Sequence, residues 1–141
     1  MRDIAFVFFL AAVLCVADGM IWSLQMAASN DHAMVGAHAH LNLVGWATMA
    51  LFAIYYRLTP QAARGWLPRV HAVAAILGVA IMVPGIALAT VGGSPGLAIL
   101  GSLLVFASML IFLGTLVRHG FGPGGAQVWT EGGSGRMAPA E

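Results

Sequence analysis

The feature that most constrains this chain is a series of four long apolar segments separated by short polar connections. Each segment has about twenty residues or more, which at 1.5 Å per residue is enough to cross the hydrocarbon core of a bilayer. Charged residues make up 8% of the chain, whereas soluble domains have about 25%. We therefore predict an all-α, polytopic membrane protein with spans at about residues 4–28, 37–58, 70–91 and 97–117.

The short connections favour a four-helix up-down bundle, which would occupy residues 1–118. Residues 119–141 are rich in glycine and proline, and we expect a flexible tail there because such a composition cannot bury a core. Small residues at helical spacing in the third and fourth spans would let the helix backbones approach closely. These residues are Ala74, Gly78, Gly85, Gly101, Ser108 and Gly114.

The placement of the basic residues predicts how the chain is oriented. None of them lies in the connections 29–36 and 92–96, and all are arginines: Arg2, Arg57, Arg64, Arg69, Arg118 and Arg136. Positive charge beside membrane spans is retained in the cytoplasm. We therefore expect both termini and the arginine-containing second connection to be cytoplasmic.

Charge and cysteine content narrow the function. The net charge of +1 argues against nucleic acid as a partner. Cys15 is the only cysteine, so neither an intrachain disulfide nor a cysteine metal cluster is possible.

A polar group opens the second span: His38, His40 and Asn42. Polar side chains are costly inside a membrane helix and usually serve a site. On an α-helix, His38 and His40 point about 200° apart, so one can serve an internal site while the other meets a partner or the headgroup layer. The alternative is a pair of interfacial histidines that cap the helix. His38 shares its face with Asn42, Gly45, Met49, Phe52 and Tyr56.

Depth brings other side chains to the same end. Asp18 lies about 22 Å along the first span, near the depth of Asn42, and we expect it to pair with His40 or Asn42 because an acid in lipid needs a partner. His32, in the first connection, could reach this site or be a solvated loop residue. Trp22, Gln25, Met20 and Met26 also belong to this end.

His71 begins the third span at the opposite face, roughly 30 Å from His38, so one cofactor cannot be bound by both. We expect His71 and His119 to be interfacial residues near arginines. Imidazole is a common ligand of iron, copper and zinc. The chain has no His-Glu-x-x-His or Cys-x-x-Cys motif, so a hydrolytic zinc site is poorly supported.

The motif His38-x-x-Leu41-Asn42, followed by an apolar run and Arg57-Leu58-Thr59-Pro60, resembles the second transmembrane helix of subunit I of heme-copper oxidases and nitric oxide reductases. The segment 31–60 also resembles short bacterial membrane proteins labelled cytochrome oxidase subunit I-like. The resemblance implies a b-type heme with His38 as axial ligand and a location in the bacterial inner membrane. His40 has no clear counterpart in that family and is an alternative ligand. Trp46, in the same stretch, is a further candidate for cofactor contact.

The oxygen-reducing centre of that family needs histidines from later helices, and no histidine lies in the outer half of the third or fourth span. A self-sufficient oxidase is therefore not expected. The second axial ligand would be His32, Met20, Met26 or a histidine of another subunit. We expect a homo-oligomer or part of a larger membrane complex that transfers electrons or senses a gas. The alternatives are a non-catalytic assembly protein that handles copper or heme, and a structural subunit.

Overall fold

The computed structural model describes residues 3–123, and every regular element within them is helical. The elements are α1 (Ile4–Ser29), α2 (Val35–His40), η1 (Leu41–Thr48), α3 (Met49–Leu58), α4 (Leu67–Thr90) and α5 (Gly96–His119). α2, η1 and α3 follow one another without a break and form one helix, Val35–Leu58. Within residues 3–123, four helices are long and apolar enough to cross a membrane, which confirms the predicted all-α, four-helix architecture, and the predicted spans agree with them within a few residues.

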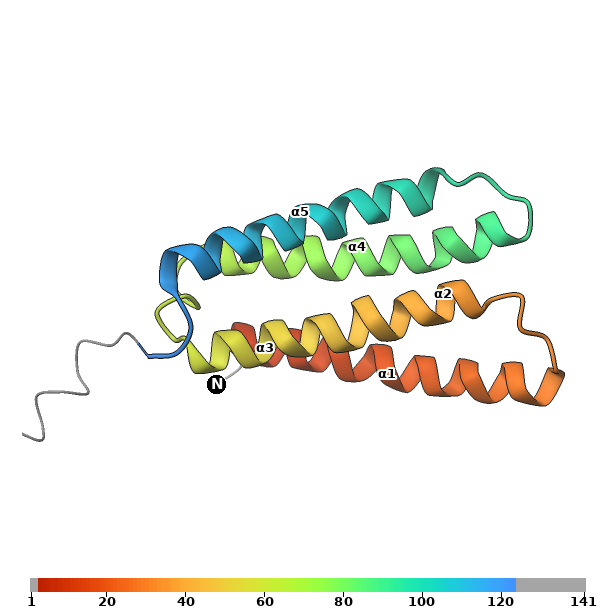
Figure 1. The fold of residues 1–141 in the computed structure, drawn as a ribbon, viewed down its shortest axis with the longest axis horizontal. Helices are drawn as coiled ribbons and strands as arrows, with labels where there is room; N and C mark the ends of the chain where they lie inside the picture. Colours follow the sequence, from red (N-terminus) through yellow and green to blue (C-terminus); the bar gives the residue numbers. More distant parts are fainter. Residues whose placement is uncertain (1–2, 124–141) are drawn as a thin grey trace, which may run out of the picture.

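The helices form two hairpins that lie side by side (Figure 1): α1 with α2–η1–α3, and α4 with α5. The connections 30–34 and 91–95 lie together at one end, which we call the loop end. The connection 59–66, the start of α1 and the end of α5 lie at the other, which we call the arginine end because Arg57, Arg64, Arg69 and Arg118 belong to it. The chain therefore runs up and down, as predicted.

Local signals fix the ends of α1. The Asp3 side chain accepts a hydrogen bond from the backbone N–H of Phe6 (2.9 Å) and so caps the first turn. Asn30 ends the helix in a left-handed conformation (φ 54°), which asparagine tolerates better than most residues. Asp3 also forms an ion pair with Arg57 (3.2 Å), which ties the start of α1 to the end of α3.

Glycines allow α4 and α5 to pack closely. A Cβ atom on Gly101 would collide with the backbone of Met82, and one on Gly85 would collide with the backbone of Ala98. Gly78 is in similar contact with Val105. These three glycines therefore act as the sequence predicted. The prediction for Gly114 was wrong, because a Cβ atom there would meet open space.

The helix that carries His38 and His40 changes its winding directly after His40. η1 is π-helical, so its hydrogen bonds join residues five apart, and such stretches occur frequently at functional sites. The predicted inward face is nevertheless confirmed, since Gly45, Met49, Phe52 and Tyr56 are all buried. Gly45 lies against α1, where a Cβ atom would be 2.9 Å from Cys15 Sγ.

The chain after α5 turns back over the arginine end. The Tyr55 hydroxyl donates to the Gly120 carbonyl (2.9 Å), and Gln61 Nε2 donates to the Gly122 carbonyl (2.8 Å). The Gly122 N–H donates to Thr59 Oγ1 (3.0 Å). The first residues of the expected flexible tail are therefore held against the bundle, and the rest of that prediction lies outside the described residues.

Candidate functional site: the histidines of the loop end

His38 lies on the inner side of the first hairpin. Its ring is half-buried and meets the edge of Trp22 of α1, with the ring centroids 6.4 Å apart. Asn42 Nδ2 donates to the His38 carbonyl (3.0 Å) and lies 3.4 Å and 3.3 Å from the two ring nitrogens. The amide nitrogen is almost equally far from both ring nitrogens, so it lies beside the ring and is not in line with one lone pair. In this position the Asn42 side chain would crowd a metal bound to His38.

His40 is oriented differently. Its Nδ1 lies 2.8 Å from the Gly36 carbonyl oxygen, and because a carbonyl can only accept, Nδ1 must carry the proton. In the neutral ring, Nε2 then has a free lone pair. Metal-binding histidines in proteins are commonly held in this way by a backbone carbonyl. The His40 ring is exposed, so Nε2 is available from outside the bundle.

The two histidines thus face different surroundings, as the sequence predicted. Leu43, three residues after His40 on the same helix, exposes 68% of its surface. An exposed imidazole nitrogen near an exposed apolar side chain is compatible with porphyrin binding.

The structure does not bring Asp18 into hydrogen-bond contact with His40 or Asn42. Asn42 packs instead against Gly19, where a Cβ atom would lie 2.7 Å from both the amide nitrogen and the amide oxygen. Asp18 is exposed and lines an apolar pocket of about 430 Å³ between α1 and α4, together with Cys15. Within residues 3–123, the Asp18 side chain forms no hydrogen bond or ion pair.

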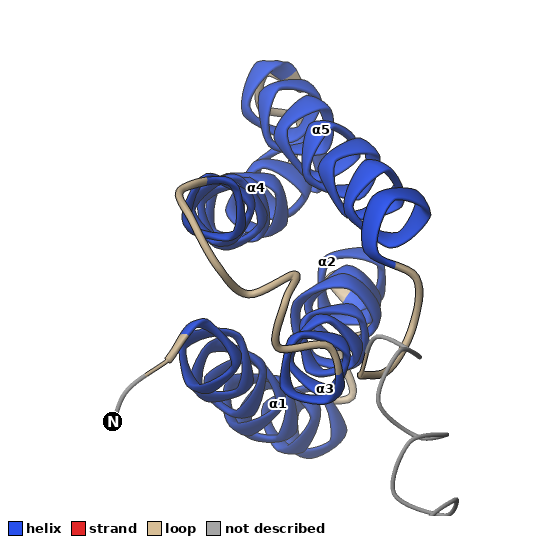
Figure 2. Cartoon of the chain, turned by 90° about the vertical axis from the view of Figure 1, so that its left-hand side faces the viewer, coloured by secondary structure: helices blue, strands red, loops and turns tan. Residues whose placement is uncertain are grey.

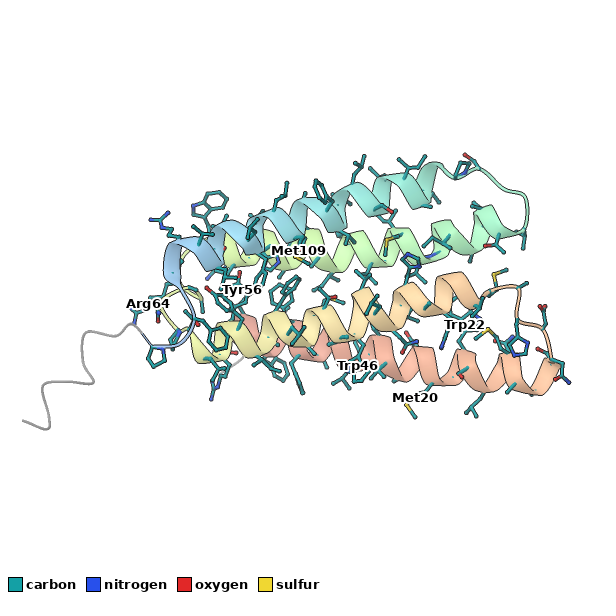
Figure 3. All side chains as sticks on the ribbon, viewed as in Figure 1. Met20, Trp22, Trp46, Tyr56, Arg64 and Met109 are labelled. Carbon is teal, nitrogen blue, oxygen red and sulfur yellow. The ribbon has the colours of Figure 1, made fainter. Side chains whose placement is uncertain are left out.

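The candidate second ligands Met20, Met26 and His32, and the further candidate Trp46, do not gather around either histidine. Met20 is 64% exposed and points away from the bundle, and Trp46 is 44% exposed on the outer surface of its helix (Figure 3). Met26 is buried in the first hairpin, and His32 is exposed in the connection 30–34. None of these four side chains contacts His38 or His40 through a described interaction. In the described part of the chain, no three His, Cys, Asp or Glu side chains are grouped closely enough to hold a metal ion.

The expectation that His71 is an interfacial residue was wrong. Its side chain is fully buried among Phe8, Phe52 and Phe112, with ring centroids 4.9, 4.6 and 5.9 Å away. Its Nδ1 lies 2.9 Å from the Tyr56 hydroxyl, whereas its Nε2 is buried without a partner among the described residues. Figure 3 shows Tyr56 pointing between the two hairpins, toward this cluster.

The helix α4 starts at Leu67, three residues earlier than predicted, so His71 lies a full turn inside it rather than at its second residue. At that depth it faces the aromatic side chains of α1, α3 and α5. Tyr56 was already assigned to the inward face of the second span. Tyr56 and His71 both carry polar groups and lie at the same end of neighbouring helices. This was the signal in the sequence that could have identified them as a pair.

Comparison of this chain with family models, curated proteins and solved structures found no match. We therefore infer a function from the geometry of the loop end.

Proposed function

We propose that this chain is a small multi-pass protein of the bacterial inner membrane that binds a b-type heme at the loop end. The observation that carries the proposal is the hydrogen bond from His40 Nδ1 to the Gly36 carbonyl (2.8 Å), which leaves Nε2 free and exposed. The resemblance to the second helix of oxidase subunit I also favours a heme ligand at this end of this helix.

The residues present fit one axial position. His40 would supply Nε2 to the iron, and the exposed apolar side chain of Leu43 would lie near the porphyrin. His38 is the alternative ligand, and there the Asn42 amide lies close to both ring nitrogens. Bound heme would supply one-electron redox chemistry or binding of a diatomic gas, with a potential that depends on the axial ligands and on burial.

The second axial position is best filled from another copy of the chain. A symmetric dimer places the same exposed residue on both sides of its axis, so two His40 side chains can meet one iron. Within one chain, Met20 points outward and Met26 is buried in the hairpin, so neither has a described contact with His40. We therefore propose a homo-oligomer with heme at the subunit boundary and a role in electron transfer or sensing.

The test is an absorption spectrum of the purified protein, expressed with added heme and recorded before and after reduction with dithionite. We expect the bands of a b-type heme in the reduced form. Absence of these bands, with copper found by metal analysis, would favour the assembly role instead. Absence of both would favour a structural subunit.

A further inference from the structure

A second feature lies at the arginine end, between α1 and α4. The two helices lie on the same side of the bundle, with the connection 59–66 at one end of them (Figure 2). A groove of about 810 Å³ opens between them, and we call it the α1–α4 groove. Its lining comprises Asp3, Ile4, Val7, Ala63, Arg64, Gly65, Arg69, Ala72, Val73, Ile76 and Leu77.

The mouth of the groove is positively charged. Arg64 and Arg69 line it and are exposed, and their side chains form no ion pair or hydrogen bond with another described residue. Asp3 also lines the groove, but its carboxylate is committed: one oxygen pairs with Arg57 (3.2 Å) and the other caps Phe6 (2.9 Å). Two free guanidinium groups beside a neutralised acid can bind phosphate oxygens.

The groove becomes apolar as it runs into the membrane-spanning part. Val7, Val73 and Leu77 line it below the arginines, and Val73 is 57% exposed. At Ile76 it meets the pocket of about 430 Å³ that continues along α1 and α4, past Ala11, Leu14, Ala80 and Val83. A positively charged mouth at the membrane surface matches an anionic lipid headgroup. The apolar path between the two helices matches an acyl chain.

We propose that the α1–α4 groove binds one anionic phospholipid, with its phosphate at Arg64 and Arg69 and an acyl chain along Val73 and Ile76. Basic pockets between transmembrane helices bind anionic headgroups in this way. Trp66, which is 70% exposed beside the two arginines, would lie at headgroup depth, where tryptophan is enriched.

A second copy of the chain is a poorer occupant of this groove. Copies inserted in the same orientation present their arginine ends to the same leaflet, so Arg64 and Arg69 of one copy would face the arginines of the next. Like charges brought together in this way repel each other. A lipid phosphate has the opposite sign and is already at the required depth.

The test is native mass spectrometry of the purified protein in detergent, titrated with phosphatidylglycerol or with phosphatidylcholine. We expect one phosphatidylglycerol to bind in preference to phosphatidylcholine. Arg69→Gln should weaken this binding by about fivefold, the effect of one basic residue near a membrane surface. Arg69→Lys should retain most of it. Glycerol phosphate at the same concentration should not compete, because it lacks the acyl chains.

Two further variants separate a built site from general charge. Arg118→Gln removes the same charge from the same end but lies outside the groove, so it should leave binding unchanged. Val73→Trp fills the apolar path without touching the arginines, and it should reduce binding even though the net charge is retained. Helical content measured by circular dichroism should stay the same in all variants.

Two results would overturn the proposal. One is equal weakening by Arg69→Gln and Arg118→Gln, which would show only nonspecific attraction of anionic lipid. The other is unchanged binding in a folded Val73→Trp variant, which would show that no acyl chain enters the groove. Both are independent of heme, so the heme proposal stands or fails separately.

Discussion

The hydroxyl of Tyr56 and Nδ1 of His71 lie 2.9 Å apart in the most aromatic part of the core, and the other ring nitrogen of His71 has no partner among the described residues. Phe8 stacks on Tyr56 and is tilted against His71, so it covers both members of the pair. This polar contact links α3 to α4 and therefore joins the two hairpins at the arginine end.

The first prediction concerns this pair. Tyr56→Phe and His71→Phe should each destabilise the protein, because each leaves one buried polar partner unsatisfied. The double variant should recover part of the loss. In a double-mutant cycle measured by reversible unfolding in detergent, the coupling should be about 0.6 kcal/mol and no more than about 1.7 kcal/mol, the range for membrane proteins. A coupling near zero would mean that the hydrogen bond does not hold the hairpins together.

The second prediction compares two glycines of α5. A Cβ atom on Gly101 would collide with the Met82 backbone, whereas one on Gly114 would meet open space. Gly101→Ala should therefore lower stability by about 1–3 kcal/mol through overpacking. Gly114→Ala should be neutral or slightly stabilising, since alanine favours a helix. Thermal unfolding of both variants checks this, and equal effects would contradict the described α4–α5 contact.

The third prediction concerns the support of His38. In Gly19→Ala, the new methyl group would displace the Asn42 side chain, which lies 2.7 Å from that position. Spectra of ¹⁵N-histidine-labelled protein should then show a changed His38 signal and an unchanged His40 signal. Gly36→Ala is the matched control, because its Cβ atom has open space and its carbonyl still accepts from His40. A His38 signal that does not move would mean that Asn42 does not hold the ring.

The same spectra test the tautomer of His40. Neutral His40 should carry its proton on Nδ1, because the Gly36 carbonyl at 2.8 Å can only accept. A signal from the tautomer protonated on Nε2 would remove the argument for a free ligand atom.

The fourth prediction is the orientation. In a Cys15→Ala background, Ser94→Cys at the loop end should react with a membrane-impermeant maleimide added to intact cells, and Pro60→Cys at the arginine end should not. The reason is the retention of arginines in the cytoplasm. Labelling of Pro60→Cys from outside would reverse the assigned depth of every site.

Sequence reasoning predicted the parts of the fold that depend on composition and period. The four spans follow from apolar length, and the burial of Gly45, Met49, Phe52 and Tyr56 follows from helical spacing. The spacing argument survived even though η1 is π-helical, because most of the buried face lies in α3, where the α-helical period returns.

The site was harder to predict because it depends on pairwise geometry. Spacing could separate His38 from His40, but not show that Asn42 covers the ring nitrogens of one while Gly36 orients the other. Depth alone suggested that Asp18 contacts Asn42. In the structure the Asn42 side chain packs against Gly19 instead, because glycine leaves room for it. The burial of His71 depends on Phe8, Phe52 and Phe112 of three other helices, and spacing within one helix does not predict such contacts.

The central claim is that a loop-end histidine holds heme, and the dithionite-reduced spectrum of three single variants tests it most directly. The account predicts that His40→Ala abolishes the b-type bands, whereas His38→Ala and His71→Ala leave them in place. Loss of the bands only in His38→Ala would move the ligand to the inner face. Bands that survive both loop-end variants but disappear in His71→Ala would contradict the account.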